Sequence, residues 1–213
     1  MNPRLALRLP TMKLALELLE LRGGTRILET GCARQVDNWE GDGMSSLVWG
    51  EWAATHNGHL TTVDADPGNL ETCRTLTAEW ADAITYVHDD SVHYMGTHTE
   101  PVDLLYLDSY DYPLIDLLEF VGGYQDFAVN VAKLHALGDD YIVEHHWDVI
   151  ASSQKHAERE MLAALPLLHD RSLVLIDDAN LPGGGKARLA RTVLADAGWT
   201  CLLDAYQTLW EKP

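Results

Sequence analysis

Acidic residues recur in this sequence directly after short apolar runs. Such positions are Glu29 with Gly31, Asp64 with Asp66, Asp89 with Asp90, Asp108 with Asp111, and Asp177 with Asp178. In an open α/β sheet the carboxyl ends of the parallel strands form the ligand-binding crevice. Carboxylates gathered there can bind ribose hydroxyls, accept a proton from a nucleophile or coordinate a hard metal ion. A single acid also serves as a turn former or helix cap, so it is the ensemble that indicates a site.

The glycine patterns that bind phosphate groups do not occur in the sequence. After Gly31 come Cys32, Ala33 and Arg34, which fit neither the G-x-G-x-x-G fingerprint nor a P-loop. Gly183-Gly-Gly-Lys186 follows the last acidic run rather than the first, and we interpret it as a flexible turn. The sequence therefore favours a ligand that contains an adenosine but no phosphate.

The apolar runs predict strands that alternate with helices. Strands are expected over Arg26–Gly31, Gly58–Asp64, Ile84–His88, Val102–Leu107, Leu173–Ile176, Thr200–Leu203 and Thr208–Trp210. Helices are expected over Thr11–Arg22, Met44–Thr55, Asn69–Trp80, Gln154–Leu168 and Lys186–Ala197. Strands that are apolar throughout are buried on both faces of a parallel sheet. We predict an α/β fold, a Rossmann-like doubly wound and mainly parallel seven-stranded sheet with helices on both faces.

The stretch between Asp108 and Leu173 is longer than one helix and two loops require. We interpret residues 113–150 as a helical insert in a single domain of residues 1–213, with helix expected over Leu114–Leu137. Inserts above the carboxyl edge of a sheet often act as lids or dimer contacts, so a homodimer is compatible with this organisation.

Two adjacent histidines in the insert are further candidates for chemistry. His145 and His146, flanked by Glu144 and Asp148, could supply a general base or a second metal site. Adjacent side chains on a helix or strand point in different directions, which favours a solvated or interface role for these histidines over a catalytic one.

The composition narrows the classes of partner. Of 213 residues, 46% are hydrophobic, and 33 acidic against 15 basic side chains give a net charge of −18. Such a chain is repelled by nucleic acid and by anionic membranes, so we expect a small-molecule partner. The sequence has no signal-peptide pattern and no apolar run long enough to span a membrane. Cys32, Cys73 and Cys201 form no metal-binding or disulfide pattern, and we expect reduced thiols and a cytoplasmic location.

Together these motifs resemble class I S-adenosylmethionine (SAM)-dependent methyltransferases. The resemblance rests on Ile27-Leu-Glu29-Thr-Gly31, Gly43-Met-Ser-Ser46 and Val63-Asp64-Ala-Asp66. Residues 102–112 and 175–178 are similar to metal-dependent small-molecule O-methyltransferases of the macrocin/novobiocin and catechol types. The match covers about residues 25–112 and 152–210. It implies transfer of a methyl group from SAM to a small-molecule hydroxyl, assisted by magnesium.

The resemblance also implies a role for each matching residue. Glu29 and Gly31 would lie beside the methionine part of SAM, and Ser45 or Ser46 would contact its carboxylate. Asp64 would bind the ribose hydroxyls, and Asp90 and Ser91 would flank the adenine. Asp108, Asp177 and Asp178 would hold Mg²⁺, which prefers oxygen ligands and lowers the pKa of a bound hydroxyl.

The sequence departs from that pattern in two places. An additional stretch, Arg34–Asp42, separates Gly31 from the next glycines, and its Trp39 either covers the site or belongs to a longer loop. Catechol-type enzymes carry a lysine where this chain has Asp111, so Asp108 itself becomes the candidate base. Asn180 could replace Asp177 or Asp178 as a ligand.

Aromatic residues near these motifs divide into two groups. Trp49, Trp52 and Trp80 are expected in the core, whereas Tyr110 and Tyr112 follow Asp108 closely enough to touch a ligand.

Three alternatives to the magnesium-assisted enzyme stay open. The first is a metal-independent methyltransferase with a histidine or aspartate base, and the second is an NAD-type oxidoreductase. The third is a non-catalytic protein that uses residues 113–150 as an interaction arm.

Overall fold

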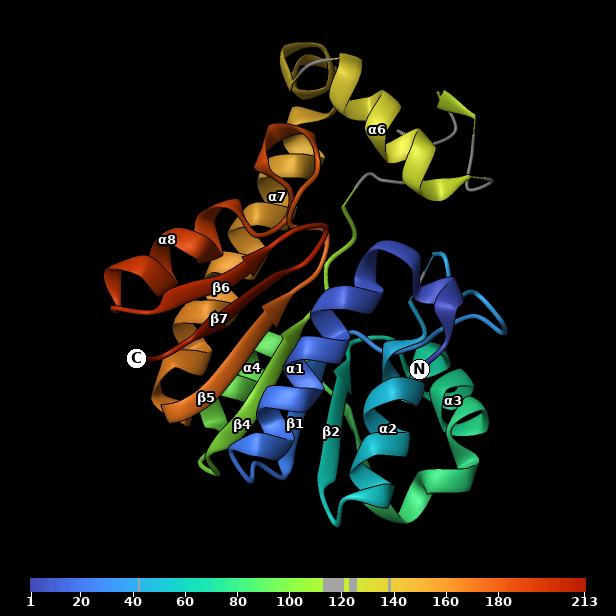
Figure 1. The fold of residues 1–213 in the computed structure, drawn as a ribbon, viewed down its shortest axis with the longest axis vertical. Helices are drawn as coiled ribbons and strands as arrows, with labels where there is room; N and C mark the ends of the chain where they lie inside the picture. Colours follow the sequence, from blue (N-terminus) through green and yellow to red (C-terminus); the bar gives the residue numbers. More distant parts are fainter. Residues whose placement is uncertain (42, 113–120, 123–125, 138) are drawn as a thin grey trace.

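A computed structural model describes residues 1–41, 43–112, 121–122, 126–137 and 139–213, with the side chains of 139–147 left out. Its strands form one sheet in the order β3-β2-β1-β4-β5-β7-β6 (Figure 1). Their bounds are β1 Arg26–Thr30, β2 His59–Asp64, β3 Ile84–His88, β4 Val102–Leu107, β5 Leu168–Ile176, β6 Thr200–Asp204 and β7 Thr208–Glu211. The first five are parallel, and β7 runs antiparallel to both β5 and β6. The predicted seven-stranded, mainly parallel sheet is confirmed.

Helices cover both faces of the sheet (Figure 1). On one face lie α1 (Leu9–Leu21) and α2 (Ser45–Thr55), whose apolar side chains pack on Ile27, Leu104 and Leu175. On the other face lie α4 (Ser91–Thr97), α7 (Asp139–Ala164) and α8 (Arg188–Asp196). The remaining elements are α3 (Pro67–Leu76), α6 (Phe127–Leu137) and the 3₁₀ segments η1 (Pro3–Arg8), η2 (Ala78–Ala83), η3 (Leu165–Leu167) and η4 (Pro182–Gly184).

The crossover helix before β5 differs from its prediction. It was expected over Gln154–Leu168, but α7 spans Asp139–Ala164 and so continues across the predicted end of the insert at Ile150. The polar residues Ser153 and Gln154 lie on its buried face, which hides the apolar period in the sequence. Since Pro166 follows the helix, the chain turns there and β5 begins at Leu168.

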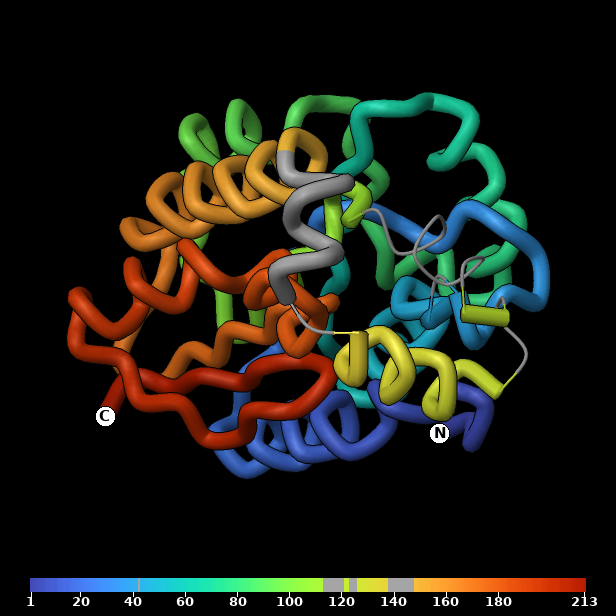
Figure 2. The backbone as a smooth tube through the Cα atoms, turned by 90° about the horizontal axis from the view of Figure 1, so that it is seen from above, coloured from blue at the N-terminus to red at the C-terminus, as the bar shows by residue number. Residues whose placement is uncertain are grey.

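Two further helices test the sequence-based assignment. The structure contains α4, a short helix capped by Asp90 that was not predicted. Only the last part of the helix expected over Leu114–Leu137 is described, as α6, and residues 113–120 lie outside the described part of the chain. Seen from above, α6 lies beside the N-terminal segment (Figure 2).

The remaining sequence-based expectations concern tryptophans, cysteines and membrane segments. Trp49 and Trp52 are buried in the core as expected, and Trp80 is half-buried against it. All three cysteines are free. Within the described residues, no helix has the length and apolar character needed to cross a bilayer.

Candidate functional site

The strand register brings the predicted site residues to one level. Thr30 of β1 pairs with Val63 of β2 and with Leu107 of β4, and Leu107 pairs with Ile176 of β5. The residues that follow these four are Gly31, Asp64, Asp108 and Asp177. All four therefore leave the sheet together at its carboxyl edge, as in other ligand-binding α/β sheets.

Gly31 occupies a position where only glycine fits. Its φ is +77°, and a Cβ atom there would lie 2.5 Å from the carbonyl oxygen of Asp108. The Gly31 amide donates to Val63 O at 2.8 Å. The loop after β1 is thus pressed against the ends of both neighbouring strands, which leaves the space above the strand ends free of side chains from this position.

Glu29 anchors α2 beneath that loop. Its fully buried carboxylate accepts hydrogen bonds from Ser45 Oγ at 2.6 Å, Ser46 Oγ at 2.6 Å and Thr62 Oγ1 at 2.7 Å. Burial raises the pKa of Glu29 to about 7, although the three hydroxyls oppose the shift. In this arrangement the hydroxyls of both serines point to Glu29 rather than outward. Ser46 Oγ also accepts from the Ala33 amide at 3.0 Å, which fixes the loop.

Asp64 terminates β2 with a carboxylate that organises the neighbouring turn. Its Oδ1 accepts from the Asp66 amide at 2.8 Å and from Asn69 Nδ2 at 3.2 Å. Its Oδ2 accepts from the Cys32 amide at 3.3 Å. The long contacts to Oδ2 and the partial exposure of the side chain leave this oxygen able to accept a ligand hydroxyl.

The residues predicted at the adenine lie at the start of α4. Asp90 is exposed and caps the helix by accepting from the His93 amide at 2.9 Å. Ser91 is buried, and its Oγ lies 3.1 Å from His156 Nε2 of α7.

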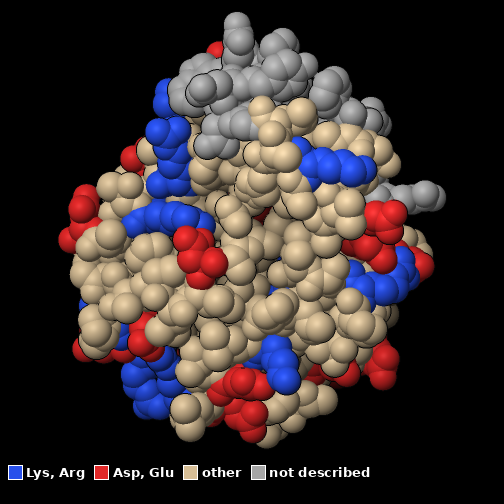
Figure 3. Space-filling view, turned by 45° about the horizontal axis from the view of Figure 1, so that its top comes forward, with Lys and Arg blue, Asp and Glu red and all other residues tan. Residues whose placement is uncertain are grey.

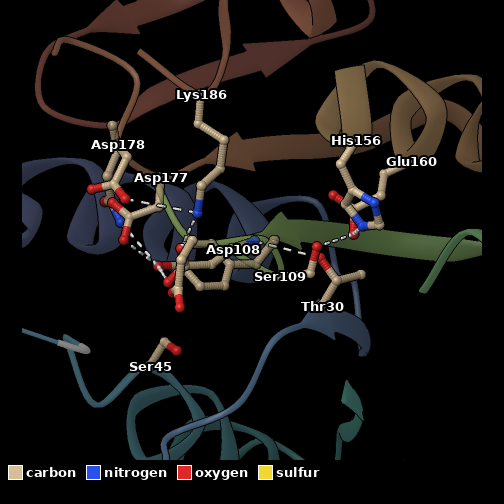
Figure 4. Close-up of polar contacts among 12 residues, drawn as sticks. Thr30, Ser45, Asp108, Ser109, His156, Glu160, Asp177, Asp178 and Lys186 are labelled. Carbon is tan, nitrogen blue, oxygen red and sulfur yellow. Dashed lines mark hydrogen bonds and ion pairs between the residues drawn. The ribbon is translucent and has the colours of Figure 1, made fainter. Parts of the chain in front are cut away.

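The three predicted magnesium ligands meet, but two cations already pair with them (Figure 4). Lys186 Nζ lies 2.6 Å from Asp108 Oδ1 and 3.7 Å from Asp178 Oδ2. Arg8 Nε lies 2.8 Å from Asp177 Oδ2 and is almost fully buried. Neither cation was predicted from the sequence, and Arg8 comes from the opposite end of the chain.

The electrostatics of the cluster follow from these pairs. Burial by itself would raise the pKa of Asp177, but Arg8 and Lys186 outweigh it and hold that pKa below its usual range. Burial would likewise lower the pKa of Lys186, yet the facing carboxylates raise it above its usual range. Three carboxylates against two cations leave one negative charge without a partner. In keeping with this, burial raises the pKa of Asp108 despite the ammonium beside it.

A glycine-rich loop carries Lys186 to this place. The Lys186 amide donates to Asp178 O at 2.9 Å, and Gln154 Nε2 donates to Gly183 O at 2.9 Å and to Gly185 O at 3.0 Å. Gly183 and Gly185 have positive φ angles, which glycine adopts without strain. The predicted turn is present, and buried hydrogen bonds from Gln154 of α7 hold it.

The arrangement does not fit a magnesium ion. Mg²⁺ requires oxygen ligands in near-octahedral geometry, and the ammonium of Lys186 lies against two of the three proposed ligands. No group of three acidic, histidine or cysteine side chains among the described residues is arranged to hold a metal. Asn180 is exposed and does not join the cluster.

A second polar cluster links α7 to the strand ends. Glu160 is buried on α7, accepts from Ser109 Oγ at 2.6 Å and lies 3.6 Å from His156 Nε2. Burial would raise the pKa of Glu160, but His156 outweighs it and lowers the pKa. His156 in turn contacts Ser91, so one histidine–glutamate pair joins the predicted adenine end to the residue after Asp108 (Figure 4). His156 and Glu160 are four residues apart, which places both on one face of a helix, and this spacing could have predicted the pair from the sequence.

The other candidates are distributed around the edge. Asp111 is exposed and pairs with Arg34 at 2.7 Å, which ties the additional loop to the end of β4. Tyr110 contacts His156 with tilted rings whose centroids lie 5.2 Å apart, while Tyr112 is buried and donates to Pro182 O. Trp39 is half-buried against the core.

His145 and His146 belong to the backbone of α7, but their side chains are outside the described part of the structure. Their predicted roles stay predictions.

An open cleft of about 600 Å³ lies between the N-terminal segment, the additional loop and α6. Arg4, Glu40 and Phe127 are among the residues that line it. The Arg8 guanidinium lies 5.9 Å from the ring centroid of Phe127, so Phe127 is placed between the cleft and the partner of Asp177. Uncharged residues dominate the middle of the face shown in Figure 3, and charged groups gather toward its margin.

No protein-family model and no curated protein matches the sequence. Solved structures do match. The O-methyltransferase from Bacillus cereus in complex with S-adenosylhomocysteine (SAH) has a TM-score of 0.56 at 15% identity, with 95% of this chain and 81% of that chain covered. The SAH-bound Podospora anserina methyltransferase PaMTH1 has a TM-score of 0.53 at 14% identity, with 95% and 78% covered. A SAM-dependent O-methyltransferase from Thermotoga maritima has a TM-score of 0.54 at 11% identity, with 95% and 64% covered.

The chain shares its fold with these methyltransferases. The sheet order differs from the dinucleotide-binding order 3-2-1-4-5-6, because the antiparallel β7 lies between β5 and β6. The fold expected from the resemblance is thereby confirmed. The assignment of the cofactor-binding residues stays a prediction.

Proposed function

We propose that this protein is a SAM-dependent methyltransferase that methylates a hydroxyl group of a small molecule. One observation carries the proposal: Gly31, Asp64 and Asp108 leave the sheet at one level, and Gly31 is too close to Asp108 to carry a side chain. The similarity to SAH-bound structures supports the cofactor, and the similarity to the O-methyltransferases of Bacillus cereus and Thermotoga maritima supports a hydroxyl acceptor.

The cofactor would lie across the ends of β1 and β2. Asp64 would accept hydrogen bonds from the ribose hydroxyls, and Asp90 and Ser91 would border the adenine at the start of α4. The methionine part would rest on the Gly31 loop, which Glu29 holds through Ser46. In this proposal Glu29 acts beneath the cofactor as a positioning residue, since its carboxylate is buried.

The sulfonium methyl would then face Asp108. Asp108 Oδ1 is bound by Lys186, whereas the contact of Oδ2 within the described part of the chain is with Tyr106 OH at 3.4 Å. The acceptor O–H would donate its proton to Oδ2 while its oxygen attacks the methyl carbon opposite the sulfur. A carbon–oxygen bond forms, the carbon–sulfur bond breaks, and its electron pair leaves with neutral SAH.

The charge of the cluster suits this reaction. With all groups ionised, Asp108, Asp177 and Asp178 exceed Arg8 and Lys186 by one negative charge. A sulfonium cation nearby is attracted by that charge. Of the forms considered from the sequence, the arrangement supports the metal-independent one, with an aspartate base. The cleft of about 600 Å³ lined by Arg4, Glu40 and Phe127 has the size of a small-molecule site.

Binding of SAH tests the proposal. At about 100 times its dissociation constant, SAH should stabilise the wild-type chain by roughly 2.7 kcal/mol, a clear rise in melting temperature. Asp64→Asn keeps the shape of the side chain but loses its charge, and we expect roughly 30-fold weaker SAH binding because charge-assisted hydrogen bonds are lost. Glu71→Gln, an exposed residue on α3, is the control and should bind SAH like the wild type. Equal affinity of Asp64→Asn and wild type would contradict the cofactor position.

A further inference from the structure

Lys186 stands out because a long cationic side chain is almost never fully buried unless it has partners. It is 2% exposed, and its ammonium group lies between two carboxylates that end different strands, Asp108 after β4 and Asp178 after β5. The position is therefore the one where a cation shared by the strand ends would lie.

The loop before Lys186 is built to deliver it there. A Cβ atom on Gly185 would lie 2.2 Å from Asp178 O, so the chain must pass Asp178 without a side chain immediately before the lysine. Gln154 Nε2 donates hydrogen bonds to the carbonyl oxygens of Gly183 and Gly185, and the Lys186 amide donates to Asp178 O. The backbone thus holds Lys186 independently of its ion pairs.

The two cations of the cluster divide the carboxylates between them. Arg8 binds Asp177 at 2.8 Å, and Tyr106 OH donates to the same oxygen at 3.1 Å. Lys186 has its shortest contact with Asp108 Oδ1, and the side chain of Asp108 is 20% exposed. The lysine therefore fixes the orientation of the proposed base.

We propose that Lys186 is a built-in cation that takes the place of a divalent metal at the strand ends, and that it positions Asp108 toward the acceptor hydroxyl. This inference rests on the proposed function for the role of Asp108. The inference that Lys186 replaces a metal rests only on its position between Asp108 and Asp178. Lys186 acts through Asp108 and is a positioning residue.

The test compares Lys186→Met, which keeps the length but removes the charge, with Lys186→Arg and with Lys155→Met on the exposed side of α7. Melting temperatures are measured with 5 mM MgCl₂, with CaCl₂ and with EDTA, and SAH affinity is measured by calorimetry. The wild type and Lys155→Met should be unaffected by Mg²⁺, Ca²⁺ or EDTA. Lys186→Met should melt roughly 10 °C lower, because buried carboxylates lose their partner, and should regain several degrees with a divalent cation. Lys186→Arg should melt closer to the wild type and stay insensitive to the metals.

A saturable rise of the wild-type melting temperature with Mg²⁺, or its fall in EDTA, would overturn the proposal. So would a Lys186→Met variant that melts like Lys155→Met or ignores both cations. If Lys186→Met fails to fold, the double variant Asp108→Asn with Lys186→Met removes one charge of each sign. The double variant should then fold, and failure to fold would contradict the pairing.

The melting experiments with Mg²⁺, Ca²⁺ and EDTA need no cofactor, so they test the role of Lys186 alone. Binding of SAH by the wild type tests the proposed function separately. SAH affinity of Lys186→Met within about threefold of the wild type is expected, because Lys186 contacts none of the proposed cofactor residues except Asp108.

Discussion

At the scale of single residues, the site is defined by what each carboxylate is paired with. Glu29 is surrounded by three hydroxyls, Asp64 by amides, and Asp108 by an ammonium group. The three hydroxyls around Glu29 carry no full charge, so they offset only part of the cost of burying its ionised carboxylate. A carboxylate therefore serves as a structural anchor on β1, at Glu29, and as the proposed base directly after β4, at Asp108.

The raised pKa of Glu29, about 7, gives a pH-dependent stability. Below its unfolded pKa near 4.5 the group is neutral in both states, and as the pH rises toward 7 only the unfolded state ionises. Ionisation therefore favours unfolding, and the wild type should lose about 2 kcal/mol of unfolding free energy between pH 5 and pH 7.5 relative to Glu29→Gln. Urea unfolding at both pH values measures this difference. Glu71→Gln should show the wild-type pH dependence, and a parallel pH dependence for wild type and Glu29→Gln would contradict the assignment.

The sequence allowed the acids at the strand ends to be predicted, because an apolar run that ends in Asp or Glu is a local pattern. It did not reveal Arg8 or Lys186. Arg8 stands in a mixed apolar segment far from Asp177 in the chain, and only the tertiary fold brings the two together. Lys186 follows three glycines that also fit an ordinary turn, and its partner Asp108 depends on how that turn is held.

At the scale of elements, the loop from β5 to α8 decides where the cation lies. Gly185 has a φ of +61°, and a Cβ atom there would lie within 2.6 Å of backbone atoms of Asp178 and Ala179. Backbone atoms cannot move aside as a flexible side chain can, so the loop has to shift if Gly185 is replaced.

Gly185→Ala should therefore lower the unfolding free energy by at least about 3 kcal/mol. The reasons are that φ +61° with ψ −174° is a conformation essentially confined to glycine, and that the added atom clashes with the backbone. Gly23→Ala is the matched control, since Gly23 has a φ of +65° but nothing within 4 Å of the added atom. Its cost should be about 1 kcal/mol, the strain alone. Denaturant unfolding compares the two variants. Equal costs for both would show that the loop is not held against Asp178.

Most elements were predictable because their apolar periods are regular, as in β4, which is buried along its whole length. The boundaries of α7 were not. Ser153, Gln154 and Glu160 are polar, yet all three are buried. Gln154 holds the glycine-rich loop, and Glu160 accepts a hydrogen bond from Ser109 at the end of β4. Polar residues on the buried face of a helix interrupt the helical spacing of apolar residues from which a helix is predicted. Gln154 and Glu160 thus interrupt the apolar pattern of α7 and at the same time contact the loop and the strand end at the site.

At the scale of the whole molecule, the sheet order and the charge limit the reaction. The antiparallel β7 between β5 and β6 separates this fold from dinucleotide-binding sheets, and the absence of glycine fingerprints agrees with this. A net charge of −18 disfavours anionic partners and favours a cationic ligand such as SAM near the carboxyl edge.

Calorimetric titration of the wild-type chain with SAH, and in parallel with NAD⁺, tests the central claim most directly. Our account predicts one SAH site per chain with a dissociation constant in the micromolar range, roughly −8 kcal/mol, and no heat of binding for NAD⁺. Absence of SAH binding, or saturable binding of NAD⁺ at the same site, would contradict it.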